Sequence, residues 1–138
     1  MLAEITERCN TVEECYEFML AYAAQGLPSD RSSQTGGEVR GYLERAVQAI
    51  DGLAKRCATA VKEEGIEPAA RYEAFFAVLE RDACSALAAI ELVVAQPAIS
   101  SQLVDNLNAS IHLRALLTDL FLLDEILKAE RQQRRAVK

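Results

Sequence analysis

The sequence is poor in residues that interrupt helices and in aromatic side chains. Its 138 residues include only three Pro and six Gly, and aromatic residues make up 6% of the chain. Hydrophobic residues, many of them alanine, nevertheless account for 51%, so the chain is not a disordered tail. No stretch alternates between apolar and polar residues as a half-buried strand would. The composition therefore predicts a single all-α domain over residues 1–138.

The chain also lacks a long hydrophobic run and an excess of positive charge. Its first residues, MLAEITERCN, include early acidic residues and no apolar core of a signal peptide. The longest apolar stretch is interrupted by Arg114, Asp119 and Asp124, which leaves it too short to span a membrane. The formal net charge is −6, whereas a domain that binds nucleic acid is usually basic. We therefore expect a cytoplasmic protein with no membrane segment, for which nucleic acid is not the expected partner.

Motifs of the common enzyme classes are missing. The sequence contains no glycine-rich phosphate loop, no G-x-S-x-G nucleophile and no H-E-x-x-H metal motif. Its cysteines, Cys9, Cys15, Cys57 and Cys84, form no C-x-x-C pair, and in a reducing compartment they are expected to be small apolar core residues. In particular, we predict that Cys57 and Cys84 are buried. The sequence gives no positive support for an enzyme, and it predicts no cofactor.

Helical periodicity and helix-ending residues divide the chain into four long helices. The first is expected to start at a capping box, Thr11 with Glu14, and to be closed by Gly26, while residues 2–9 allow a short preceding turn of helix. Gly65 and Pro97 are expected to lie outside helices as well. The four predicted helices cover residues 11–25, 38–64, 68–96 and 100–131. Joined by mostly short connections, they favour an antiparallel four-helix bundle.

Two segments lie outside these helices. Residues 26–37, GLPSDRSSQTGG, form the only long stretch rich in helix breakers and predict a flexible loop. Residues 129–138 are a basic tail, which could dock on an acidic partner or on nucleic acid. We favour a frayed helix end instead, because positive charges suit the negative end of the helix dipole. Likewise, the acidic residues near the amino terminus are interpreted as a solvated helix end and not as partners of the tail.

A leucine stripe in the last predicted helix is the sharpest feature of the chain. Its residues recur at intervals of three and four: Leu113, Leu116, Leu120, Leu123 and Leu127. Leu117, Phe121 and Leu122 extend the apolar surface beyond what a small four-helix core consumes. We therefore predict that these three side chains form a homodimer interface. The resulting hypothesis is a non-enzymatic cytoplasmic protein that acts through protein–protein association, as an accessory, adaptor or assembly factor.

The single histidine supports an alternative hypothesis. Asp105, Asn108, His112 and Asp119 recur at helical spacing, and carboxylate and imidazole groups are suitable metal ligands. Ferritin-like sites usually need a Glu three residues before the histidine, where this chain has Ala109. The alternative is therefore a ferritin-like or other metal-binding bundle, with a site of His112, Asp105 and Asp119 shared across a dimer. A weaker hypothesis, small-ligand binding between the helices, rests on Tyr16, Tyr22, Tyr42 and Tyr72.

Overall fold

The computed structural model describes residues 2–31 and 36–137, and within these ranges it is all-helical with no strand. The composition-based prediction of an all-α chain is confirmed. Six helices are present in place of the four expected. Their bounds are α1 Leu2–Ala24, α2 Gly36–Ile50, α3 Leu53–Glu63, α4 Ala69–Val94, α5 Ser101–Ala109 and α6 Ile111–Val137.

Two of the expected helices are each divided by a short break. The helix expected over residues 38–64 is split into α2 and α3 at Gly52, whose φ of 69° is left-handed and cannot continue a right-handed helix. The helix expected from residue 100 onward is split into α5 and α6 at Ser110, whose ψ of 131° is extended. Buried residues continue at helical spacing on both sides of each break, so the apolar pattern alone did not reveal them.

The start predicted for the first helix is wrong. Thr11 lies in the middle of α1, and its hydroxyl donates to the carbonyl of Glu7, 3.0 Å away, as an interior threonine does. The helix begins at Leu2 because Leu2, Ile5 and Cys9 extend its buried side toward the amino terminus. By contrast, all three predicted helix-ending positions are confirmed. Gly26, Gly65 and Pro97 each lie beyond the end of a helix.

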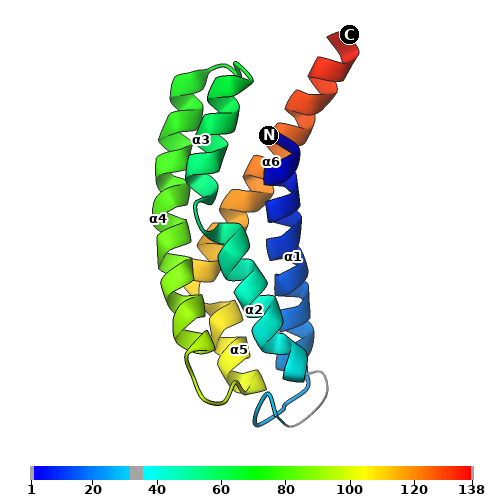
Figure 1. Cartoon of the computed structure of the whole chain (residues 1–138), viewed down its shortest axis with the longest axis vertical. Coiled ribbons are helices and arrows are strands. Elements are labelled where there is room, and N and C mark those ends of the chain that lie inside the picture. The colour runs from blue at the N-terminus through cyan, green and yellow to red at the C-terminus, as the bar shows by residue number, and fades with distance from the viewer. Residues whose placement is uncertain (1, 32–35, 138) are drawn as a thin grey trace.

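Neighbouring helices bury one shared core (Figure 1). α1 packs mainly on α2 and α5, α3 lies along α4, and α6 packs against both α4 and α1. The amino terminus and the carboxy-terminal end of α6 lie toward the same end of the molecule (Figure 1). Every residue of the leucine stripe is buried, so the stripe is the side of α6 that faces the core.

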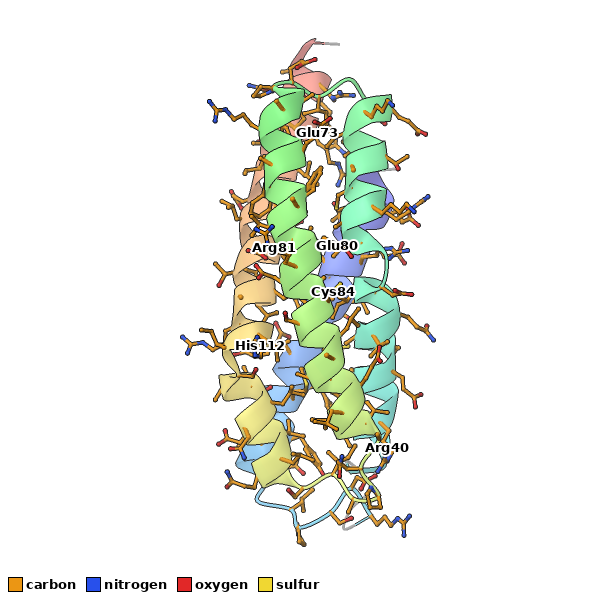
Figure 2. The ribbon with its side chains drawn as sticks, turned by 90° about the vertical axis from the view of Figure 1, so that its left-hand side faces the viewer. Arg40, Glu73, Glu80, Arg81, Cys84 and His112 are labelled. Carbon is orange, nitrogen blue, oxygen red and sulfur yellow. The ribbon has the colours of Figure 1, made fainter. Side chains whose placement is uncertain are left out.

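The described part of the loop after α1 is joined to neighbouring residues by hydrogen bonds, and the flexibility of residues 26–37 stays a prediction. The Asp30 carboxylate is buried, and it accepts hydrogen bonds from the Ile99 amide at 2.9 Å and from Nε of Arg40 at 2.7 Å. The Arg40 guanidinium also donates to the carbonyls of Val94 and Gln96, both at 2.7 Å, near the end of the molecule where Figure 2 labels it. Arg40 compensates the charge of Asp30, and both side chains have hydrogen-bond partners. The cluster thereby joins the loop after α1 to the loop after α4. Of the predicted loop, residues 32–35 lie outside the described residues, and residues 36 and 37 belong to α2.

Candidate functional site

The outer side of α6 exposes large apolar side chains. Phe121 and Leu122 are each 51% exposed, and Ile126 is 39% exposed. Leu122 and Ile126 are four residues apart and lie side by side on the helix, whereas Phe121 lies about 100° round the helix axis from Leu122. Ile111, the first residue of α6, is 74% exposed, and two further large apolar side chains are exposed on other helices, Leu20 on α1 and Leu92 on α4.

Leu117 does not belong to this surface, and its assignment to a subunit interface is wrong. Its side chain is only 4% exposed. Leu117 follows Leu113 by four residues and precedes Leu120 by three, so it stands on the core side of α6 beside the leucine stripe. Phe121 and Leu122 lie further round the helix, where each side chain is about half exposed. The candidate association surface is therefore Phe121, Leu122 and Ile126.

A pair of carboxyl groups joins α4 to α6. Asp119 of α6 is 9% exposed and shares a hydrogen bond with Asp82 of α4. Burial raises the pKa of Asp119 to about 7, and the hydrogen bond to Asp82 and repulsion by its charge act in the same direction. Among the residues described, Oδ2 of Asp119 has no hydrogen-bond partner. Asp119 therefore keeps its proton in mildly acidic solution.

A second buried carboxylate lies between α6 and α1. Asp124 is 6% exposed and forms an ion pair with Lys128, Oδ2 to Nζ, at 3.0 Å. Burial, followed by the charge of Asp124, raises the pKa of Glu13 on α1. Burial also raises the pKa of the neighbouring Cys9 thiol to about 12. Lys128 therefore compensates negative charge on both helices at this seam.

The residues proposed as metal ligands do not converge within one chain. His112 and Asp105 are exposed, whereas Asp119 is buried against Asp82. In the described parts of the chain, no group of three or more histidine, cysteine, aspartate and glutamate side chains is placed to hold a metal ion. A metal site built on His112, Asp105 and Asp119 would therefore need ligands from a second copy of the chain.

The cysteines divide three to one. Cys9, Cys15 and Cys57 are buried as predicted, but Cys84 is exposed, which contradicts its assignment to the core. Cys84 follows the core residue Ala83 and so lies off the buried side of α4, on the same side of this helix as Glu80 (Figure 2). Its thiol donates to Glu80 Oε1 at 3.3 Å, and this hydrogen bond raises the pKa of Cys84. A thiol with a raised pKa is a poor nucleophile.

Two of the four tyrosines, Tyr22 and Tyr42, have contacts that fix their side chains. Tyr22 is fully buried, and its hydroxyl donates to the carbonyl of Ile99 at 2.6 Å. Tyr42 stacks on Phe18, with ring centroids 4.0 Å apart, and carries the guanidinium of Arg45 on its ring at 4.2 Å. Both tyrosines therefore have structural roles in packing α1 against its neighbours.

Residues 129–137 of the basic tail belong to α6, and the fraying of this helix end stays a prediction. Arg131 donates to Oγ1 of Thr6 at 3.2 Å, and Arg134 pairs with Glu64 at 2.6 Å. These contacts hold the end of α6 against α1 and the end of α3, although the last turns extend beyond the amino terminus of α1 (Figure 1). The acidic start of α1 binds elsewhere, because Glu4 accepts from Nε of Arg56 on α3 at 3.0 Å.

Comparisons with protein-family models, with curated proteins and with solved structures found no match for this chain. None of the helices over the described residues is long and apolar enough to cross a membrane.

Proposed function

We propose that this chain is a non-enzymatic cytoplasmic protein that acts through protein–protein association and forms a homodimer through the outer side of α6. The observation that supports the proposal is the set of large apolar side chains Phe121, Leu122 and Ile126, each of which stays about half or two-fifths exposed in the described chain. Surfaces of this kind on water-exposed helices commonly mark interaction sites. The role of the protein would be that of an accessory, adaptor or assembly factor.

The size of the surface predicts a weak, concentration-dependent dimer. Fully burying a large apolar side chain stabilises by roughly 1.5–3 kcal/mol, so the half-exposed side chains of this surface contribute about 1 kcal/mol each. Three from each of two copies give about 6 kcal/mol, which is comparable to the lower estimates of the cost of association, about 4 kcal/mol. The surrounding residues of α6 must therefore supply most of the remaining free energy that a dimer at tens of micromolar requires.

The same proposal treats the six helices as an antiparallel four-helix bundle. In this description α2 and α3 form one column of the bundle, and α5 and α6 form another. A short break interrupts each column, but the chain continues in the same direction after it. Support comes from the short breaks, two residues between α2 and α3 and one residue between α5 and α6. In such a bundle the α5–α6 column has two flanking neighbours and one outer side, which is the side proposed to associate.

The test compares the unmodified chain with the double variant Phe121→Glu, Leu122→Glu by sedimentation at tens of micromolar. The unmodified chain is expected to dimerise, and the variant is expected to be monomeric with unchanged helicity by circular dichroism. Leu92→Glu is the matched control, because Leu92 is 66% exposed but belongs to α4. A monomeric unmodified chain would contradict the proposal.

Metal analysis of the purified protein separates this proposal from the metal-binding alternative. Stoichiometric iron, manganese or zinc would contradict a purely associative role. The metal site would then have to be shared between two copies, since the described part of one chain does not assemble it.

A further inference from the structure

Resting on the association proposed above, we propose a specific geometry for the dimer. α6 of one copy packs antiparallel on α6 of a second copy, with Arg114 of each copy opposite Glu125 of the other. The two-fold axis passes between Thr118 and Phe121.

The outermost line of α6 carries this inference. Arg114, Thr118, Phe121 and Glu125 are all exposed, and they are spaced by four, three and four residues. This spacing keeps the four side chains on one line along the helix. A positive charge stands at one end of the line and a negative charge at the other, about 16 Å apart at 1.5 Å per residue.

The line of side chains is complementary to the same line on a second copy of α6 that runs in the opposite direction. The midpoint between Arg114 and Glu125 is also the midpoint between Thr118 and Phe121. A two-fold axis at this midpoint therefore places each arginine opposite a glutamate and each phenylalanine beside the smaller threonine. Such self-matching is what a two-fold symmetric interface requires, because the same patch meets itself. Parallel packing would instead place arginine against arginine and glutamate against glutamate.

The two charges of this line are available for a second copy. Neither Arg114 nor Glu125 forms an ion pair with any residue in the described part of the chain. Further along the same helix, by contrast, Lys128 and Arg134 pair with carboxylates of their own chain. Leu122 is exposed beside the line, and Ile126 lies further round the same side of α6.

Charge-exchange variants test this geometry. In R114E and in E125R, both inter-copy ion pairs are replaced by like charges, so each homodimer is expected to weaken about tenfold relative to the unmodified chain. The double variant R114E/E125R restores two attractive pairs and is expected to dimerise like the unmodified chain. Mixing the two single variants is expected to give a heterodimer that is tighter than either homodimer, because every pair is again attractive.

The controls keep the change of net charge constant. Arg135→Glu matches R114E, and Asp105→Arg on α5 matches E125R; both positions are exposed and lie off the line. Dimerisation of these controls is expected to be unchanged in sedimentation at low salt. If the unmodified chain dimerises but R114E and E125R do so equally well, the antiparallel geometry is wrong and the association proposal stands. If the unmodified chain is monomeric, both are wrong.

Discussion

Replacing Asp119 with Asn is expected to stabilise the chain near pH 8. Asp119 lies between α4 and α6, where burial and the neighbouring Asp82 raise its pKa from an ordinary 3.8 to about 7. In mildly acidic solution the folded chain therefore holds a proton that the unfolded chain releases. Above about pH 7 that proton is lost, and two negative charges face each other across the seam between the helices.

The magnitude follows from the difference between the folded and unfolded pKa. Each pKa unit corresponds to about 1.4 kcal/mol, and the difference is about three units, which gives about 4 kcal/mol. Because the folded chain binds more protons than the unfolded chain, the free energy of unfolding falls as the pH rises from about 4 to about 7. Asn is neutral throughout and can still donate a hydrogen bond to Asp82. The Asp119→Asn variant should therefore match the unmodified chain near pH 4 and exceed it by up to about 4 kcal/mol near pH 8.

Urea denaturation followed by circular dichroism between pH 4 and pH 8 measures this difference. Other groups that titrate in the range, such as Glu13, contribute equally to both proteins and cancel in the comparison. Asp105→Asn, at an exposed position of α5, is the neutral control. Asp124→Asn should act in the opposite direction, because it removes the ion pair with Lys128. Equal stability of Asp119→Asn and the unmodified chain near pH 8 would refute the reasoning.

Two further predictions concern the loop cluster and the thiols. Arg40→Ala should lower the free energy of unfolding by about 2–3 kcal/mol, because it leaves the buried Asp30 carboxylate without its cation. Urea denaturation measures the loss, and a change below about 0.5 kcal/mol would contradict the role assigned to the cluster. A polar thiol reagent should label one thiol per native chain, that of Cys84, and the C84S variant should not react until it unfolds. Rapid labelling of a second thiol would show that the other three cysteines are not buried as described.

Local patterns were sufficient for much of the fold. The leucine stripe of α6 predicted its core-facing side, because a period of three and four residues places side chains on one side of any helix. Gly26, Gly65 and Pro97 predicted helix ends for equally local reasons, since these residues disfavour a continuing helix. The all-helical class followed from composition, and the buried positions of Cys15 and Cys57 followed from helical periodicity, whereas Cys9 was expected in the core from cysteine usage alone.

Tertiary packing decided the rest. The apolar period continues across Gly52 and Ser110, so the sequence pattern could not show that α2 with α3 and α5 with α6 are divided. The width of a buried side depends on how many neighbours a helix has, which is why Leu117 is buried and Cys84 is exposed. The pairing of Asp82 with Asp119 required α4 and α6 to meet at one level. The periodicity of a sequence indicates which side of a helix is apolar. Only the packing of the helices determines which neighbours contact that side, and at which level along the helix axis.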